Sequence, residues 1–452
     1  MITICKSACC MKRKIVATFE SWRTTPNRKP LVVKGCRQCG KTYSVLEFAH
    51  SHYRHVVYLD FHRYAAYRAL FAGSLEPRDI LMKLSAVVPD AAFVPGETCF
   101  VFDEIQECPR ARAALKFLHL DGRFDYICTG SLLGVNGYRS PDKGDDMASI
   151  PVGYETIVDM YPMDFEEFLW ANGIPTEMIA RLRQALHDET PVDTFIHERM
   201  RELLLQYTVV GGMPAVVDSF VREHNLSTVL MLQRGIVDEY KGDMVKYAAD
   251  IDKPRIRRCF ESIPAQLSRE NKKFTYSVVE RSARAKDYWG SLQWIEDAGI
   301  IRRCRNLTIT ELPLDGNAEN DTFKVYMADT GLFVSVLEDG TQGAIICGDL
   351  LGYKGAIFEN LVADMLGKMG RRLYYYRKDS GLELDFVLRY KGECVPLECK
   401  AVSGRAKSLQ TVLAHPEKYH VWHALKLGDY NVGREGALLT LPLYMAFLLT
   451  EV

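Results

Sequence analysis

The feature that most constrains the fold of this chain is a segment that fits the pattern G-x-x-x-x-G-K-[ST]. An apolar run at residues 30–34 precedes it, a helical pattern at 43–49 follows, and a second apolar run occupies 55–60. Strand, loop, helix and strand in this order predict the first unit of a parallel α/β sheet. The segment consists of Gly35, Cys36, Arg37, Gln38, Cys39, Gly40, Lys41 and Thr42.

The residue types in this loop suit the binding of a nucleoside triphosphate. Gly35 and Gly40 let the backbone wrap closely around phosphate groups, and the helix that begins near Lys41 points its positive end at them. Lys41 is expected to reach the β- and γ-phosphates of ATP, and the Thr42 hydroxyl to bind Mg²⁺. A chance match in a glycine-containing turn is the alternative, and the surrounding pattern argues against it. We therefore expect ATP and Mg²⁺ as cofactors.

An acidic pair follows the next apolar strand, at residues 99–102. Asp103 is expected to hold Mg²⁺ through its water shell, and Glu104 to polarise the water that attacks the γ-phosphate. An Asp-Glu pair after a strand often only caps a helix. Here it follows the right element after the right loop, so it predicts hydrolysis as well as binding.

Two residues with hydroxyl groups come directly after the next expected strand, at residues 126–128, and one of them is expected to sense the γ-phosphate. Ser131 is preferred over Thr129, although both can instead cap the next helix. An arginine that completes the site from a neighbouring chain cannot be chosen from sequence. The candidates are Arg110, Arg112, Arg123 and Arg139.

Five segments carry a resemblance to a known family: residues 34–42, 103–109, 129–134, 161–169 and 211–214. Together they are similar to segments of prokaryotic AAA-type ATPases that have a nuclease-like C-terminal domain of unknown function. The resemblance covers most of the chain. The chain departs from the family at Tyr154, where relatives carry a basic residue, and residues 1–10 resemble an added extension.

Composition limits the classes of protein that remain. The 452 residues, 48% hydrophobic and 25% charged, suffice for two or three domains, and a net charge of -1 restricts nucleic-acid binding to local basic surfaces. There is no apolar run long enough for a membrane span and no signal peptide, so a cytoplasmic protein is expected. Thirteen cysteines agree with reduced thiols, and zinc binding by Cys36 and Cys39 is disfavoured because no second pair completes the site.

The middle of the chain, from about residue 195 to 300, has helical apolar spacing, and residues 274–301 predict the last helices and first strand of a winged helix. Basic residues concentrate there: Arg255, Arg257, Arg258, Lys272, Lys273, Arg281, Arg284, Lys286, Arg302, Arg303 and Arg305. Such a face suits contacts with a DNA backbone. Equally, these residues can be solvated helix faces that pair with Glu261, Glu270 and Glu280 on a protein-docking module.

The C-terminal part contains four residues whose pattern resembles the PD-(D/E)xK nuclease superfamily. Glu359 lies near the start of an amphipathic helix, Asp385 lies on one strand, and Glu398 and Lys400 share one face of the next. The resemblance implies that the three carboxylates hold Mg²⁺ or Mn²⁺ and that Lys400 activates water. The alternatives are a surface ion pair, or a site kept for binding only.

The expected fold is α/β and multidomain: a P-loop AAA-type parallel sheet, a helical and winged-helix region, and a small restriction-endonuclease-like domain. The expected ranges are 1–10 for the extension, then 11–194, 195–335 and 336–452. The leading hypothesis is an ATP-driven switch or remodeller whose nuclease-like module binds or cleaves DNA or other nucleic acid. The alternative is a signalling ATPase whose later domains bind protein partners without catalysis. Oligomerisation is compatible with both.

Overall fold

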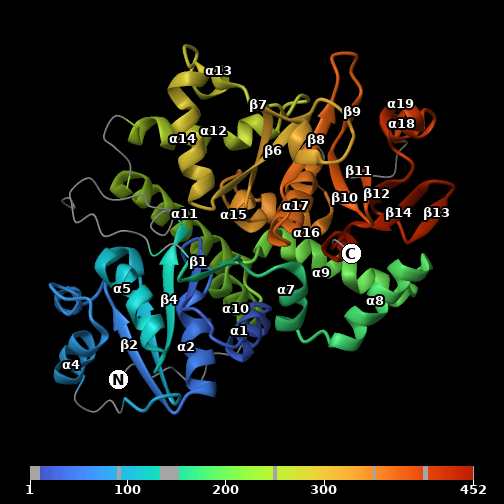
Figure 1. Ribbon diagram of the computed structural model, residues 1–452. Helices are drawn as coiled ribbons and strands as arrows, with labels where there is room; N and C mark the ends of the chain where they lie inside the picture. The colour runs from blue at the N-terminus through green and yellow to red at the C-terminus, as the bar shows by residue number, and fades with distance from the viewer. Residues whose placement is uncertain are drawn as a thin grey trace.

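The computed structural model describes most of the chain (Figure 1). The described residues are 11–88, 93–132, 151, 153–247, 252–349, 353–400 and 406–450. The expected extension at residues 1–10 lies outside them, as does Arg139.

The N-terminal part is built on a parallel sheet with the strand order β2-β3-β4-β1-β5. Its strands are β1 (Leu31–Gly35), β2 (His55–Asp60), β3 (Thr98–Asp103), β4 (Asp125–Ser131) and β5 (Thr156–Met160). Because β4 lies between β1 and β3, the loops after these three strands meet at one edge of the sheet. The parallel α/β sheet expected from the sequence is thus confirmed.

Helices cover both faces of this sheet because its central strands are apolar on both sides. Val33 and Val101 pack on the face covered by α1 and α2, whereas Val32 and Phe100 pack on the face covered by α4 and α5. The helices and the 3₁₀ turn are α1 (Ile15–Thr24), α2 (Lys41–His52), α3 (Ala66–Ala69), α4 (Pro77–Val87), η1 (Ile105–Glu107) and α5 (Pro109–Asp121).

A layer of helices follows, which runs in Figure 1 from the lower right through the middle of the molecule to its top. These helices are α7 (Phe165–Ala171), α8 (Thr176–Asp188), α9 (Thr194–Val210), α10 (Pro214–Glu223), α11 (Leu226–Tyr247), α12 (Lys253–Leu267), α13 (Tyr276–Val279) and α14 (Ala285–Asp297). The last three precede an antiparallel strand pair, which is the order a winged helix requires. That pair is not an isolated wing, because its first strand also pairs with a strand from the C-terminal part.

Two further sheets complete the fold. The first has the order β7-β6-β8-β9 and the second β10-β11-β12-β14-β13. Their strands are β6 (Ile301–Leu307), β7 (Ala318–Met327), β8 (Leu373–Arg377), β9 (Glu383–Leu384), β10 (Phe386–Tyr390), β11 (Glu393–Cys399), β12 (Ala424–Gly428), β13 (Gly433–Glu435) and β14 (Leu438–Pro442). The first of these sheets crosses the boundary that was expected at residue 335.

Short and long helices pack around these two sheets: η2 (Leu314–Asn317), α15 (Thr330–Ser335), α16 (Thr341–Cys347), α17 (Lys354–Lys368), α18 (Lys407–Leu413), α19 (Pro416–Tyr419) and η3 (Leu443–Leu448). The sequence predicted an amphipathic helix around Glu359, and that prediction is wrong in one respect. Every residue of α17 from Ala356 to Lys368 is buried, because sheets and helices surround it.

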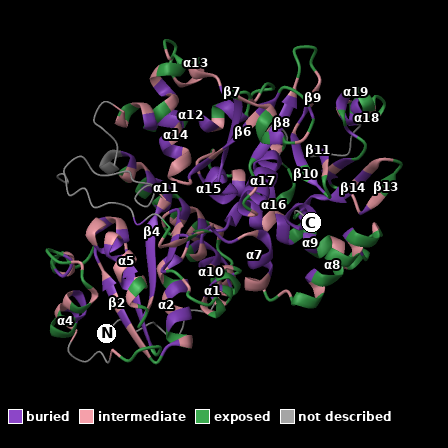
Figure 2. Cartoon of the chain, viewed as in Figure 1, coloured by how far each residue is buried: buried purple, intermediate pink, exposed green. Residues whose placement is uncertain are grey.

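One hydrophobic core runs through the molecule, from Phe19 in α1 to Leu449 near the C-terminus. Figure 2 shows this continuity as buried ribbon that passes from the N-terminal sheet through α17 into the C-terminal sheets, with exposed residues at the periphery. Cys36 and Cys39, in the loop after β1, belong to this same core. Among the described helices, none combines the length and apolar character that crossing a membrane demands.

Candidate functional site

The phosphate-binding loop connects the end of β1 to the start of α2, as the sequence predicted. Two of its residues have a left-handed backbone, Gln38 with φ 61° and Gly40 with φ 92°. Gly35 is required for a different reason: a Cβ there would lie 2.3 Å from the Met160 carbonyl oxygen on β5. The loop thus follows a tight path that other residues at positions 35 and 40 would disturb.

Lys41 lies within the curve of this loop. Its Nζ donates to the carbonyl oxygens of Gly35, at 3.1 Å, and Cys36, at 2.8 Å, and the side chain is buried. The ammonium group is therefore held inside the loop by two of the loop's own carbonyl groups.

Asp103 gathers hydroxyl groups from three other elements. Thr42 Oγ1 lies 3.0 Å from Asp103 Oδ1, Tyr58 OH lies 2.6 Å from Oδ2, and the Thr129 hydroxyl also donates to this carboxylate. The structure thus brings together Thr42 and Asp103, the two residues predicted to hold Mg²⁺. Burial raises the pKa of Tyr58, and its hydrogen bond to Asp103 acts in the same direction. Tyr58 was not predicted, because nothing in the β2 pattern marks it.

Glu104 follows directly at the same edge of the sheet. Its backbone is left-handed, with φ 53°, which is uncommon for a residue with a side chain. The Glu104 N–H lies 3.4 Å from Thr129 Oγ1, and its carboxylate accepts a hydrogen bond from the Gln106 side chain. Such local strain is typical of residues held in place for function.

The two hydroxyl candidates on β4 have different surroundings. Thr129 contacts Asp103, whereas Ser131 is buried and lies beside Gly35 in the register of β4 with β1. The described arginine candidates have structural partners. Arg110 donates to the Phe71 carbonyl at 2.8 Å, Arg112 pairs with Glu155 at 2.6 Å, and Arg123 pairs with Asp121 at 2.8 Å.

A different arginine, Arg13, contacts the loop. Its guanidinium donates to the carbonyl oxygens of Cys39, at 2.9 Å, and Tyr161, at 2.7 Å, and pairs with Glu167 at 3.1 Å. It thereby ties the loop to the segment after β5. Sequence reasoning missed it, because Arg13 precedes the motif by more than twenty residues within an ordinary basic run.

The thiols of Cys36 and Cys39 are both buried. A hydrogen bond from Cys36 lowers the pKa of Cys39, and the positive charges of Lys41 and Arg13 act in the same direction. In the described ranges there is no cluster of three or more His, Cys, Asp or Glu side chains that could hold a metal ion.

Glu359 of the nuclease-like motif is enclosed by positive charge. Its Oε1 lies 3.0 Å from Lys324 Nζ, its other oxygen pairs with Lys272, and the Tyr326 hydroxyl donates to it. The side chain is 3% exposed, so two ammonium groups neutralise a buried carboxylate. The sequence did not indicate these partners: Lys324 and Tyr326 lie on β7, and Lys272 lies on the loop between α12 and α13.

Of the other three motif residues, Asp385 lies between β9 and β10 and not within a strand as expected, Glu398 lies on β11, and Lys400 directly follows β11. Phe386 pairs with Leu397, so Asp385 and Glu398 are neighbours across β10 and β11. The Cys399 N–H donates to Asp385 Oδ2 at 2.9 Å, and Lys400 forms an ion pair with Glu398. Glu359, Asp385 and Glu398 nevertheless do not form a metal-binding cluster, because within the described residues no three such side chains are grouped closely enough to hold a metal ion.

Several basic residues of the middle region have acidic partners. Arg257 lies 2.8 Å from Glu261 and Arg258 lies 2.6 Å from Glu280, both on exposed surfaces. These two pairs match the interpretation of solvated helix faces. Arg302 and Arg305 differ from these arginines, because neither forms an ion pair with a carboxylate of a described residue.

Asp385 provides a pH-dependent test of the C-terminal arrangement. Burial and the charge of Glu359 raise its pKa from 3.8 to about 7. Between these pH values the folded chain binds more protons than the unfolded chain, so the free energy of unfolding falls as the pH rises. Because asparagine does not titrate, Asp385→Asn should remove this decrease in the free energy of unfolding, which amounts to up to about 4 kcal/mol.

The measurement is urea unfolding of both proteins at pH 5 and pH 8. The variant should be the more stable protein at pH 8, and the difference should shrink at pH 5. Parallel stability curves for the two proteins would show that Asp385 does not titrate in this way.

Residues 27–169 match the family described as "AAA domain". Residues 201–343 match "Domain of unknown function (DUF8612)", and residues 354–444 match "Domain of unknown function (DUF4143)". No curated protein matches the chain.

Among solved structures, the Walker-type ATPase PABY2304 of Pyrococcus abyssi is similar at 13% identity with a TM-score of 0.43, over 72% of this chain and 95% of that one. The AAA match covers the sheet, the loop and the acidic pair described above. The N-terminal part of the chain therefore has a P-loop ATPase fold.

Proposed function

We propose that the chain binds ATP with Mg²⁺ at the loop of residues 35–42 and hydrolyses it. The observation that carries this proposal is the meeting of Thr42 and Asp103 at 3.0 Å, beside the buried Lys41. The donor set around Asp103 consists of oxygen atoms from a carboxylate and hydroxyl groups, which suits a hard cation such as Mg²⁺. Residues 11–194 would form this ATPase part.

Each residue would have a separate role. Lys41 would neutralise the β- and γ-phosphates, and Thr42 and Asp103 would hold Mg²⁺, which supplies charge neutralisation when bound. Glu104 would orient and polarise the attacking water from its strained backbone position. Ser131 would report the γ-phosphate from the end of β4, where it lies beside Gly35 of the loop.

The loop also contacts helix α11, which supports an ATP-driven switch or remodeller. Arg37 pairs with Asp243, the Gln38 side chain bonds to Glu239, and Tyr240 OH donates to the Arg37 carbonyl at 3.1 Å. A change in the loop upon ATP binding or hydrolysis would be transmitted to α11 through these contacts. The structural change in α11 would then reach the other helices of the layer and the C-terminal sheets.

For the C-terminal part we propose binding without cleavage. The carboxylate of Glu359 is satisfied by Lys272, Lys324 and Tyr326, so a metal ion would have to displace two ammonium groups to reach it. Nucleic acid remains the proposed partner of the leading hypothesis, and a protein partner that of the signalling alternative.

ATP hydrolysis tests the first proposal. With Mg²⁺, Lys41→Ala and Glu104→Gln should each lower the hydrolysis rate at least about 100-fold. Glu104→Gln should still bind ATP, because the phosphate contacts remain. Lys83→Ala is the control, since Lys83 lies on α4, away from the loop, and its Nζ donates to the carbonyl oxygens of Leu70 at 3.4 Å and Ala72 at 2.9 Å. A Glu104→Gln protein that hydrolyses ATP at the unaltered rate would refute the assigned role.

Nuclease activity tests the proposal that the C-terminal part binds its partner without cleaving nucleic acid. Purified protein should leave labelled single- and double-stranded DNA intact in Mg²⁺ or Mn²⁺. Degradation that disappears in the Asp385→Ala, Lys400→Ala double variant would instead establish the nuclease of the leading hypothesis.

A further inference from the structure

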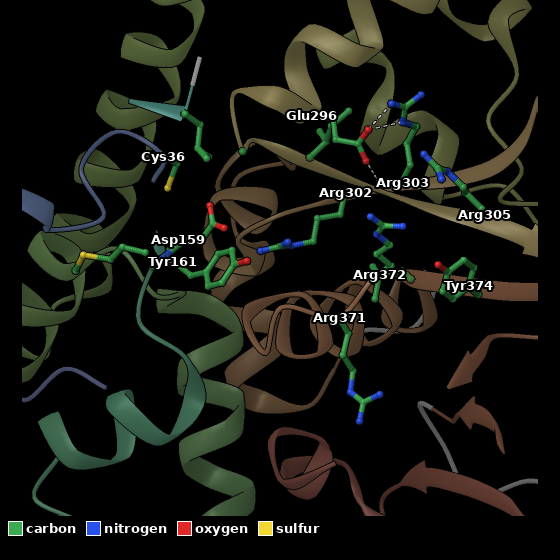
Figure 3. Close-up of a pocket in the computed structure, with 16 residues that line it drawn as sticks. Cys36, Asp159, Tyr161, Glu296, Arg302, Arg303, Arg305, Arg371, Arg372 and Tyr374 are labelled. Atoms are coloured by element: carbon green, nitrogen blue, oxygen red, sulfur yellow. Dashed lines mark hydrogen bonds and ion pairs between the residues drawn. The ribbon is translucent and has the colours of Figure 1, made fainter. Parts of the chain in front are cut away.

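An arginine-rich cavity of about 410 Å³ lies beside the phosphate-binding loop (Figure 3). Cys36 of the loop and Tyr161 after β5 form one side of it. The opposite side comes from β6 and from the turn before β8. Its arginines are Arg302, Arg303, Arg305, Arg371 and Arg372.

The charges in the cavity do not balance. Asp159 and Glu296 are the only carboxylates among the described residues that line it, so the lining has an excess of three positive charges. Both carboxylates already have partners: Asp159 lies 3.5 Å from Lys34, and Glu296 pairs with Arg303. Grouping cations without counter-charges is unfavourable unless an anion binds among them.

The arginines differ in how far their charges are already used. Arg372 pairs with Asp315 at 2.9 Å, and Arg371 donates to the Arg389 and Leu449 carbonyls. Figure 3 shows Arg371 pointing away from the Tyr161 side of the cavity. Arg302 and Arg305 pair with no carboxylate in the part of the chain that the structure describes. These two residues are therefore the ones available to an anionic ligand.

Arg302 is fixed in position before any ligand binds. Its guanidinium carbon lies 5.0 Å from the centre of the Tyr161 ring, and Figure 3 shows it reaching toward that ring. A Cβ at Gly367 would lie 2.2 Å from Arg302 Nε, so the absence of a side chain on α17 makes room for the arginine. That Nε is buried and has no hydrogen-bond partner among the described residues. A preorganised donor binds its ligand with less loss of conformational entropy.

We propose that this cavity binds a phosphate-bearing ligand, with Arg302 and Arg305 as the principal contacts. Guanidinium groups match phosphate oxygens with paired hydrogen bonds, and the volume suits a ligand of nucleotide size. The site is separate from the ATP site, because Lys41, Thr42 and Asp103 do not line the cavity. It shares Cys36 with the loop, and Arg13 joins Tyr161 to Cys39, so an occupied cavity would lie one contact from the P-loop.

The phosphate can come from a free nucleotide or from a nucleic-acid strand, and two probes distinguish these sources. Binding of pyrophosphate and of a labelled oligothymidine is measured at low salt in a Lys41→Ala background, where the proposed ATP site is disabled. Binding of both probes means that the phosphate group suffices, and binding of oligothymidine alone identifies the strand. Binding of neither overturns the proposal.

The Arg302→Ala, Arg305→Ala double variant should weaken binding of the probe at least about tenfold. The charge-matched control is Arg257→Ala, Arg258→Ala, which removes two exposed arginines outside the cavity and should retain binding. Equal losses in the double variant and the control, or unchanged binding in the double variant, would contradict the proposal.

A second measurement uses the chain with all its arginines, so that it does not depend on the folding of the double variant. Phenylglyoxal modification of Arg302 and Arg305, followed by mass spectrometry, should slow when the bound probe is present, while modification of Arg257 should not change. Equal modification of Arg302 and Arg305 with and without the probe would overturn the site, whatever the ATPase measurements show.

Discussion

The convergence of hydroxyl groups on Asp103 is the interaction on which the account of this protein depends. Thr42, Tyr58 and Thr129 come from three different elements, and they meet only because parallel strands end at the same edge of the sheet. A buried carboxylate is unfavourable without such donors. The same carboxylate with the same oxygen-rich surroundings is what a Mg²⁺ site requires, so structural need and proposed function coincide.

The second constraint is the junction that joins the ATPase sheet to the C-terminal part. Lys368 Nζ lies 2.9 Å from Asp364 and 3.1 Å from Asp329, and the Gly212 N–H donates to Asp329 at 2.7 Å. A Cβ at Gly212 would lie 2.0 Å from the Met163 carbonyl. The glycine pair at 211–212, one mark of the family resemblance, is thus explained by close packing against a buried ion-pair network. Such networks favour one arrangement of neighbouring elements over others, and here that would keep the two parts in register.

The sequence predicted best what depends on contiguous residues. The loop of residues 35–42 and the acidic pair after β3 are local patterns with fixed spacing, and the structure places Thr42 against Asp103 as expected. The sequence could not predict contacts between residues that lie on distant segments of the chain. The lysines around Glu359 come from positions 272 and 324, and Arg13 reaches the loop from α1's start, because tertiary packing sets these contacts. The Glu-x-Lys pattern was visible, but whether its carboxylates converge on a metal depends on counter-ions that no spacing reveals.

The most direct test of the central claim is the thermal stability of the chain with ATP and with AMP, each in the presence of Mg²⁺. The loop and Asp103 are proposed to bind the terminal phosphates, so saturating ATP should raise the melting temperature by about 3 °C, and AMP should have little effect. The increase should be lost in Lys41→Ala. Equal stabilisation by AMP and ATP, or none by ATP, would contradict the assignment of residues 35–42 as the nucleotide site.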